Sequence, residues 1–371
     1  MGPVLTVGVE EEFLLVDADG RPLPVAPQVL AHPAAAGCKA ELMTFQLETA
    51  SSVHTDLASL RAELLALRRG AAAAAGDSGA LLLATGTSPF GLPEALPLSD
   101  VPRYRELARR FPGAMPAAAS CGCHVHVGVP DRDAGARVLG RLAPWLPVLL
   151  ALAANSPFGD GTDSGWASSR FRLQLTWPSF RPPRRWRDGV SYDASVRSLI
   201  RTGRVLDERA VYFLARLSPR YPTVEVRVAD VCLDVEDAVL LAALVRALVL
   251  TTLRSPPGPE ARPGRERARL LSAARLGVLP EGHDVSRPDW LGELRRLRAA
   301  VLPALEETGD ADAVGRAVDR LALTGGGAHR QRGVWGPQPR LVVDALATLT
   351  LAGAAPVPGV VRLPATPVPT S

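Results

Sequence analysis

The chain has 371 residues, with 47% hydrophobic and 22% charged side chains, proportions typical of a globular protein with one large domain or two ordinary ones. Of its 42 basic residues only Lys39 is a lysine, so a Walker-type phosphate loop, which requires Gly-Lys followed by Ser or Thr, is excluded. The net charge of +4 rests on arginines that are not interleaved with aromatic residues, and we therefore expect no nucleic-acid groove.

The first strand, predicted over residues 4–16, is interrupted by three adjacent glutamates. Successive side chains of a strand point to opposite faces, so Glu10 and Glu12 share one face and Glu11 takes the other. Two carboxylates about 4 Å apart repel each other by roughly 4 kcal/mol at an effective dielectric constant near 20. The triplet therefore indicates either a divalent metal site or an exposed edge strand with solvated glutamates.

The next predicted elements alternate between strands and helices. A second strand is predicted over residues 42–53, where Glu48 stands among apolar neighbours. Thr55 or Asp56 is expected to cap a helix that runs to about residue 76. These elements are followed by a buried strand and a short helix, over residues 80–87 and 102–111.

The strand predicted over residues 120–129 carries two cysteines and two histidines. Cys121 and Cys123 point away from His124 and His126, because they have the opposite parity in the strand. This alternation argues against a zinc site with mixed ligands, which usually uses turns. The two histidines are interpreted either as metal ligands or as a surface ladder or satisfied core pair.

A long apolar helix is predicted over residues 132–154, and an arginine-rich loop follows over residues 158–190. The next strand, predicted over residues 222–231, places Glu225 and Arg227 on one face. This pair is interpreted either as a simple ion pair or as a metal-binding carboxylate beside an arginine that holds a phosphate oxygen. Guanidinium groups bind phosphate through two parallel hydrogen bonds.

Helices dominate the remainder of the chain. Asp234 is expected to cap a helix that runs to about residue 253. A Pro/Gly linker at 255–264 is followed by predicted helices over residues 264–277, 290–307, 311–323 and 338–352. The glycine triplet Gly325–Gly327, followed by two arginines, is by itself most typical of a helix C-cap. We expect one catalytic domain over residues 1–353 and a proline-rich, flexible tail over residues 354–371.

The order of these elements predicts an α+β fold with a curved, mainly antiparallel sheet packed on helices. Three of its strands carry polar pairs on one face and apolar residues on the other. All three polar pairs are explained by a sheet whose apolar face packs on helices and whose charged face lines a cavity. A site of several glutamates and one histidine suits Mg²⁺ or Mn²⁺ better than zinc.

Several motifs occur in the order of a known family. They are Val7-Gly-Val-Glu-Glu-Glu-Phe13, Gly122-Cys-His-Val-His-Val-Gly128, Ala154-Asn-Ser-Pro157, Arg170 after Trp166-Ala-Ser-Ser169, Ser218-Pro-Arg-Tyr-Pro-Thr-Val-Glu-Val-Arg-Val-Ala-Asp230 and the late Gly325-Gly-Gly-Ala-His-Arg-Gln-Arg332. The chain resembles the type 2 glutamate–cysteine ligase-like proteins, also called carboxylate–amine ligases, from residue 4 to about residue 350.

The resemblance implies a glutamine-synthetase-like fold, in which the curved sheet forms an active-site funnel with helices outside. It also implies ATP-dependent amide formation, in which a carboxylate takes the γ-phosphate to form an acyl phosphate and an amine then displaces phosphate. The amide can be a γ-glutamyl bond. The implied ligands of Mg²⁺ or Mn²⁺ are Glu10, Glu12, Glu48, His124 and Glu225. The implied catalytic residues are Arg227 and Arg170, and the implied ATP contacts are Arg227, Arg330 and Arg332.

The chain also departs from the family pattern. Leu214 stands where the family carries an aspartate, and Arg172 and Thr176 replace a glutamine and an arginine. We interpret these changes as an altered substrate wall, which favours a specialised pathway ligase over one for glutamate and cysteine.

Two other functions stay open at this point: a non-catalytic homologue that binds nucleotide or amino acid, and a metal-dependent hydrolase that uses no ATP. The expected partners are a small carboxylate, such as glutamate, and an amine, with neither nucleic acid nor membrane. The sequence leaves a homo-oligomer open. The first residues lack the features of a signal peptide, and the apolar stretch at 239–250 is short and contains Arg246, so a reducing cytoplasm is the expected compartment.

Overall fold

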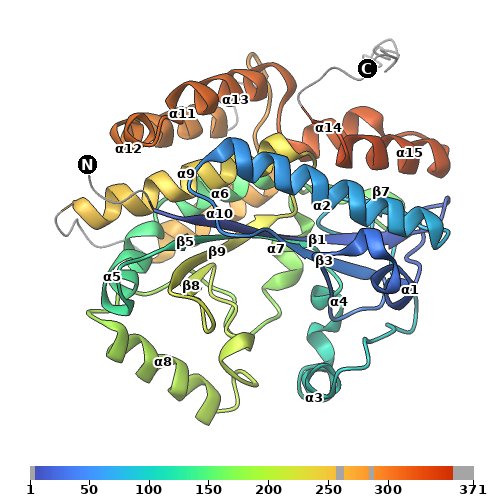
Figure 1. Cartoon of the computed structure of the whole chain (residues 1–371), viewed down its shortest axis with the longest axis horizontal. Helices are drawn as coiled ribbons and strands as arrows, with labels where there is room; N and C mark the ends of the chain where they lie inside the picture. The colour runs from blue at the N-terminus through green and yellow to red at the C-terminus, as the bar shows by residue number, and fades with distance from the viewer. Residues whose placement is uncertain (1–4, 256–262, 284–287, 354–371) are drawn as a thin grey trace.

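Within the residues that the structure describes, an antiparallel sheet of seven strands runs through the middle of the molecule, with helices on both sides (Figure 1). The computed structural model describes residues 5–255, 263–283 and 288–353. The tail predicted over residues 354–371 lies outside the described residues, as does most of the predicted linker. The predicted α+β class and antiparallel sheet are confirmed.

The strands follow one another across the sheet in the order β2-β3-β1-β5-β9-β8, and β4 pairs with β1. Their bounds are β1 Val7–Val16, β2 Cys38–Ala40, β3 Gln46–Ala50, β4 Leu81–Leu83, β5 Gly122–Gly128, β8 Ala215–Leu217 and β9 Thr223–Asp230. A separate short hairpin is formed by β6 Phe158–Gly159 and β7 Thr162–Asp163. The four strands predicted to carry the polar residues are therefore present, although β3 is shorter than predicted.

The helices are mostly short, with two long ones against the sheet. Their bounds are α1 Ala26–Ala31, α2 Leu57–Asp77, α3 Pro102–Arg110, α4 Met115–Ala118, α5 Arg132–Leu142, α6 Leu146–Ala153, α7 Ser169–Gln174, α8 Gly189–Arg201, α9 Val235–Arg254, α10 Pro263–Leu276, α11 Trp290–Ala300, α12 Leu302–Glu307, α13 Ala311–Thr324, α14 Gly327–Val334 and α15 Pro339–Thr350. Single 3₁₀ turns occupy Pro33–Ala35, Pro112–Ala114 and Glu208–Ala210. Asp56 and Asp234 cap the two long helices α2 and α9, each accepting a hydrogen bond from the backbone N–H three residues later.

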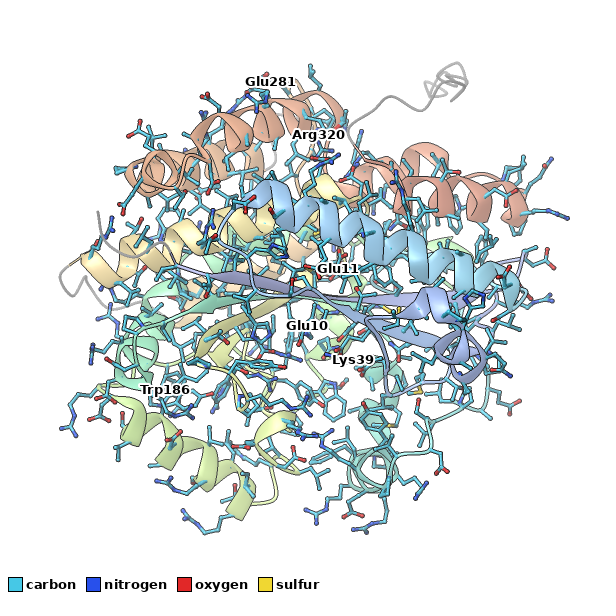
Figure 2. The ribbon with its side chains drawn as sticks, viewed as in Figure 1. Glu10, Glu11, Lys39, Trp186, Glu281 and Arg320 are labelled. Carbon is cyan, nitrogen blue, oxygen red and sulfur yellow. The ribbon has the colours of Figure 1, made fainter. Side chains whose placement is uncertain are left out.

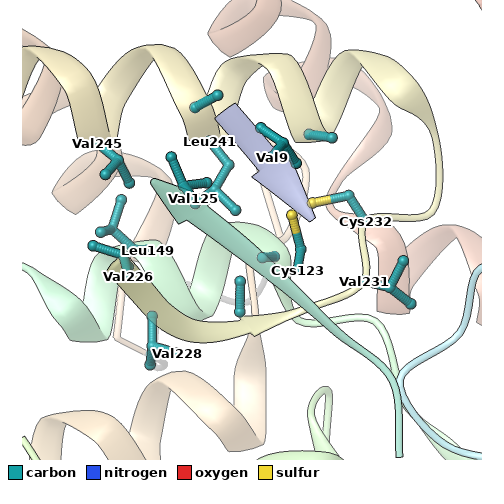
Figure 3. Close-up of a cluster of buried hydrophobic side chains, with 14 of the residues drawn as sticks. Val9, Cys123, Val125, Leu149, Val226, Val228, Val231, Cys232, Leu241 and Val245 are labelled. Atoms are coloured by element: carbon teal, nitrogen blue, oxygen red, sulfur yellow. The ribbon is translucent and has the colours of Figure 1, made fainter. Parts of the chain in front are cut away.

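The apolar face of the sheet packs on α2, α9 and α6, and the helices α11 to α15 lie beyond them (Figure 1). Alternate residues of the three central strands supply this face, because side chains of a strand alternate in direction. Figure 3 shows part of this core, with contributions from β1, β5, β9, α6 and α9: Val9, Cys123, Val125, Leu149, Val226, Val228, Leu241 and Val245. The opposite face looks toward α3, α4 and α8 (Figure 1).

The strand register brings the polar residues of the second face together. Glu10 lies opposite His124, and Glu12 lies opposite Glu48. His126 in turn lies opposite Glu225 on the next strand. Residues directly opposite in antiparallel strands have Cβ atoms about 4.5–5.5 Å apart, so their side chains can meet.

Two helix predictions were wrong in length. The helix predicted over 132–154 is divided into α5 and α6, which meet at an angle of 75°. The helix predicted over 290–307 is divided into α11 and α12. In both cases a proline stands in the first turn of the second helix, where its missing N–H is harmless, and it cannot continue the preceding helix.

Five helices were not predicted: α1, α4, α7, α8 and α14. α7 lies in the segment interpreted as a loop, α8 begins at its end, and α14 follows the glycine triplet. The helix before that triplet does end at Gly325, which has a φ of 68° and so adopts a conformation that favours glycine.

No single helix in the described part of the chain is long and apolar enough to cross a membrane. The bent pair α5 and α6 meets the length and composition criteria only when its two helices are taken together.

Candidate active site

A cavity of about 180 Å³ lies on the polar face of the sheet, and we call it the central cavity. Its floor is formed by acidic, imidazole and guanidinium groups of the strands: Glu10, Glu12, Glu48, His124, His126, Glu225 and Arg227. Its walls include groups from α3 and from the segments around β2 and β8: Lys39, Glu41, Arg103, Tyr104, Tyr212, Arg216 and Tyr221. All five sequence-predicted metal ligands therefore lie in one cavity, as does Arg227.

Glu11 points to the other side of the sheet from Glu10, as the alternation predicted (Figure 2). Its side chain is fully buried, and Arg68 of α2 donates hydrogen bonds to both carboxylate oxygens at 3.0 and 2.6 Å. The same guanidinium also donates to the carbonyl oxygens of Cys232 and Thr350, each at 2.8 Å. Glu11 therefore links the central strand to three other parts of the chain and takes no part in the central cavity.

Two groups of side chains in the central cavity have ligand atoms close enough to share a cation. One group is Glu10, His126 and Glu225, and the other is Glu12, Glu41 and Glu48. Within each group the ligand atoms all lie within 4.8 Å of one another. The first group combines two carboxylates with a single imidazole, and the second consists of carboxylates alone. Such oxygen-rich sets suit Mg²⁺ or Mn²⁺.

The histidines of β5 are oriented toward the glutamates. His124 Nδ1 lies 3.5 Å from Glu10, and its Nε2 lies 3.8 Å from Glu12. His126 Nδ1 lies 3.0 Å from the Thr223 hydroxyl, which leaves its Nε2 facing Glu10 at 3.6 Å. Both Nε2 atoms are buried and have no hydrogen-bond partner among the described residues. Two buried imidazole nitrogens without partners are the state expected of ligands that a cation would satisfy.

The two groups differ in their electrostatics. Burial, together with the nearby charges of Glu10 and Glu12, raises the pKa of Glu48 to about 7. The pKa of Glu41 is raised well above its usual value by burial and by Glu12 and Glu48. Burial also opposes the charge of Glu10, but the two imidazoles outweigh it and hold the pKa of Glu10 well below its usual range. Lys39 lies 3.5 Å from Glu48 and offsets part of the repulsion within the second group, and a bound cation would relieve the rest.

Glu225 lies between two arginines. Arg216 of β8, directly opposite in the sheet, donates to its two oxygens at 2.8 and 3.1 Å, and Arg227 donates to one of them. Although burial raises the pKa of Glu225, these two guanidinium groups bring it well below its usual value. Arg227 also reaches within 3.3 Å of His124 Nδ1, so its guanidinium stands at the boundary between the carboxylates and the imidazole. The ion pair that the sequence allowed is present, and Glu225 nevertheless keeps an oxygen near Glu10 and His126.

Arg170 lies at the far end of the site, in a smaller cavity that we call the inner cavity. This cavity of about 70 Å³ shares Glu12, Glu41, His124 and Arg227 with the central cavity and continues past Arg170 to Trp177 and Phe180. The guanidinium of Arg170 donates to the carbonyl of Ala229 at 3.0 Å and lies 3.8 Å from Asp230, and its buried Nε has no partner in the described structure.

Asp230 is held in place by the loops around it. Its carboxylate accepts hydrogen bonds from the Asn155 N–H and from the hydroxyls of Ser156 and Ser168 at 2.7–2.9 Å. The Ala154–Pro157 and Trp166–Arg170 motifs thus converge on the acid that stands beside Arg170, and they orient its guanidinium toward the inner cavity.

The structure does not bring Arg330 and Arg332 to the site. Arg330 pairs with Asp234 and Asp237 at the start of α9, on the helix-covered side of the sheet. Arg332 pairs with Asp163 at 2.7 Å. Neither arginine lines the central or the inner cavity. Their guanidinium groups hold α14 against α9 and the β6–β7 hairpin, so these ion pairs account for both arginines without ATP.

Known proteins are similar to this chain in sequence or in fold. The family model described as glutamate–cysteine ligase family 2 matches residues 6–334. The chain belongs to this family. A relative from Mycolicibacterium vanbaalenii, named "Putative glutamate--cysteine ligase 2-2", is 44% identical over 349 residues, which are 90% of this chain and 94% of the relative. One from Salinispora arenicola, named "Putative glutamate--cysteine ligase 2", is 43% identical over 93% of this chain and 95% of its own length.

Solved structures of low sequence identity share the fold of this family member. The glutamate–cysteine ligase of Francisella tularensis, crystallised in complex with AMP, aligns with a TM-score of 0.69 and 15% identity over 93% of this chain and 88% of that chain. A bifunctional glutathione synthetase from Pasteurella multocida aligns with a TM-score of 0.68 and 15% identity over 94% of this chain and 52% of that chain. The family and the ligase class predicted from the motifs are confirmed: the protein is an ATP-dependent C–N ligase of the glutamate–cysteine ligase type.

Three residues that line the central cavity of this ligase, Glu41, Arg216 and His126, were not among the site residues predicted from the sequence. Glu41 precedes β3 in a segment with no periodic signal, so its approach to Glu12 depends on the β2–β3 turn. Arg216 reaches Glu225 only through the pairing of β8 with β9. His126 did carry a signal, since it shares a face with His124.

Leu214, which replaces the aspartate of the family pattern, lies outside the two cavities that hold the predicted site residues. It is buried and lines neither the central nor the inner cavity. Its side chain instead lines a third cavity next to Phe180. The interpretation of Leu214 as part of an altered substrate wall stays a prediction.

Proposed function

We propose that this protein joins a small carboxylic acid to an amine with ATP, through an acyl-phosphate intermediate formed over the central cavity. The observation that carries the proposal is the presence of two sets of cation-binding side chains on the polar face of the sheet. Arg227 lies beside them, in contact with Glu225 and His124. Phosphoryl transfer depends mainly on positioning and on cations along the phosphate oxygens, and this face concentrates groups that can supply both.

The proposed reaction has two steps. An oxygen of the substrate carboxylate attacks the γ-phosphorus of ATP, the bond to the β-phosphate oxygen breaks, and ADP leaves. The nitrogen of the amine then attacks the acyl carbon, the bond to the phosphate oxygen breaks, and phosphate leaves as the amine loses a proton. Arg227 is placed to hold a phosphate oxygen, and Arg170 is placed to hold the carboxylate or phosphate at the inner end.

The residues that would hold Mg²⁺ or Mn²⁺ are the two groups described above. His124 stands between them and has a free Nε2, so it can serve either group. The bound cations supply neutralisation of the phosphate oxygens and polarise the phosphorus for attack. Glu41, which was not among the ligands predicted from the sequence, joins Glu12 and Glu48 in the second group.

The size of the inner cavity favours a small acid. Trp177 and Phe180 close it at one end, and Arg170 presents a cation at the other. Glutamate, whose second carboxylate or α-carboxylate could contact Arg170, is the first acid to test.

A phosphate-release assay with pooled substrates tests the function. Purified protein, ATP and Mg²⁺ are incubated with a panel of carboxylic acids crossed with a panel of amino acids and amines, and products are read by mass spectrometry. We expect phosphate and a new amide only where one acid and one amine are both present. Nucleotide binding without turnover across the panel would instead support a non-catalytic homologue, and turnover that survives removal of nucleotide would support a hydrolase.

Gly122 offers a test of Arg170 with the substrate pair found in that assay. A Cβ added at Gly122 would lie 2.4 Å from Arg170 Nη2, so Gly122→Ala is expected to push the guanidinium aside. Because misplacement of a positioning group by about 1 Å can cost on the order of 10²-fold, we expect kcat/KM to fall by about 10- to 100-fold.

Gly8→Ala is the matched control for this substitution. Gly8 lies on the same face of the sheet, on β1, and its added Cβ would meet only ordinary contacts at 3.6 Å or more. Equal kcat/KM values for the two variants would show that Arg170 does not need its observed position.

A further inference from the structure

The third cavity is the largest of those described here and lies beside the inner cavity. It has a volume of about 820 Å³ and is enclosed by the 175–185 segment and by α10, with Gly140 of α5 and Leu214 at its sides. Trp177 and Phe180 line both this cavity and the inner cavity, so the two share an aromatic wall. Its volume falls in the range of about 300–1,000 Å³ that is typical of small-molecule sites.

One part of the cavity lining is apolar and well ordered by packing. Trp177, Phe180, Leu214 and Leu270 are each less than 10% exposed, and Phe171 packs edge-on against Phe180. These side chains form a preformed aromatic and aliphatic surface that is poorly hydrated. A ligand with an aromatic or branched aliphatic body would bury apolar area there.

The rest of the lining is strongly basic. It contains four arginines, Arg181, Arg184, Arg185 and Arg267, against the single acid Glu266. Among the residues that the structure describes, Arg181, Arg184 and Arg267 have no carboxylate within ion-pair distance, unlike most other arginines near the site. Unneutralised guanidinium groups facing one cavity attract anions.

Arg181 is the least exposed of the four arginines that line this cavity. Its Nε is buried and has no hydrogen-bond partner among the described residues, and its guanidinium lies over the ring of Phe213 at 5.2 Å. Burial and the like charges of Arg184 and Arg204 lower the pKa of Arg181. An anion would relieve this repulsion and satisfy the free N–H.

Glu266 does not cancel this positive charge. One of its carboxylate oxygens is buried and has no hydrogen-bond partner within the part of the chain that the structure describes, and burial raises the pKa of its carboxyl group. The single acid of the lining is therefore the group whose negative charge is least favoured.

We propose that this arginine-lined cavity is a binding site for an anionic small molecule with an aromatic or branched aliphatic body. The carboxylate, sulfonate or phosphate group of the ligand contacts Arg181 and Arg267, and its apolar body lies against Trp177, Phe180 and Leu214. The site is separate from the central cavity, and the proposal does not depend on which acid and amine the ligase joins.

A pair of fluorescent probes tests the proposal on the whole protein. The anionic probe is 1-anilinonaphthalene-8-sulfonate, and the neutral probe is N-phenyl-1-naphthylamine, which has the same aromatic body without the sulfonate. We expect the anionic probe to bind at least 10-fold more tightly, and saturating ATP with Mg²⁺ to leave it bound. Displacement by ATP would place the probe in the central cavity and would overturn the proposal.

Arginine variants locate the probe. Arg181→Ala and the exposed Arg267→Ala are each expected to weaken binding of the anionic probe by about 10-fold and to leave the neutral probe unchanged. Arg187→Ala is the control, because Arg187 lies near the same segment, pairs with Asp188 and is outside the cavity. Since Arg267 is exposed, its variant keeps the test meaningful if Arg181→Ala impairs folding. Equal effects of Arg267→Ala and Arg187→Ala, or equal affinity for the two probes, would refute the site.

Discussion

Glu10→Gln is expected to abolish ligase turnover while the protein stays folded. The substitution keeps the shape of the side chain but removes the charge that lies near His124, His126 and Glu225. Loss of an outer-shell partner alone typically lowers metal affinity or activity by 10- to 100-fold, so loss of a direct ligand is expected to lower kcat by at least about 100-fold. Turnover is measured as formation of ADP and amide with the substrate pair from the panel assay.

A second measurement distinguishes a variant that no longer binds the cation from one that binds it but no longer catalyses the reaction. Ligands that bind only the folded state raise its apparent stability, so Mg²⁺ or Mn²⁺ should raise the melting temperature of the unaltered protein. We expect this rise to be reduced or absent in Glu10→Gln and in Glu48→Gln, with circular dichroism spectra like that of the unaltered protein. Normal turnover together with a normal metal-induced rise in both variants would refute the metal assignment.

Glu11→Gln, one position further along the same strand, is expected to lower the stability of the protein and to leave its turnover intact. Glu11 and Arg68 form an ion pair in which both side chains are fully buried. Removing one partner of a buried pair leaves an uncompensated charge and typically lowers the free energy of unfolding by about 3–5 kcal/mol. Urea denaturation should show a lower midpoint, while the folded fraction at low temperature keeps its turnover.

A double variant shows whether the broken ion pair between Glu11 and Arg68 is the cause of the lost stability. In Glu11→Leu with Arg68→Met, apolar side chains of similar size replace both charges, so part of the lost stability should return. The recovery is expected to be incomplete, because Arg68 also donates hydrogen bonds to the carbonyls of Cys232 and Thr350. A midpoint for Glu11→Gln equal to that of the unaltered protein, or a loss of turnover like that of Glu10→Gln, would contradict the assignment of Glu11 to structure.

The opposite outcomes for two adjacent glutamates follow from sheet geometry. Side chains of β1 alternate between the helix-covered face and the cavity, and the same alternation divides Cys123 from His124 on β5. On the first face a charge needs one fixed partner. On the second face several carboxylates lie close together, and this arrangement can bind cations.

The period of two in the strands, read from the sequence alone, was enough to assign Glu10, Glu12, His124, Glu225 and Arg227 to one face. That assignment is local, because each side chain's direction depends only on its neighbours in the strand. The helix caps Asp56 and Asp234 were predictable for the same reason, since a cap bonds to an N–H three residues later.

Only the tertiary structure decided which groups complete the site and which arginines stay outside it. Arg216 enters the central cavity through strand register, and a shift of register by one residue would turn it away. Glu41 enters it through the turn between β2 and β3. Arg330 and Arg332 carry the same charge as Arg227, but a guanidinium binds whichever acid the packing places beside it, and here those acids are Asp234, Asp237 and Asp163. The direction of a side chain is set within its own strand or helix, whereas the partner of a long charged side chain is set by elements far away in the chain.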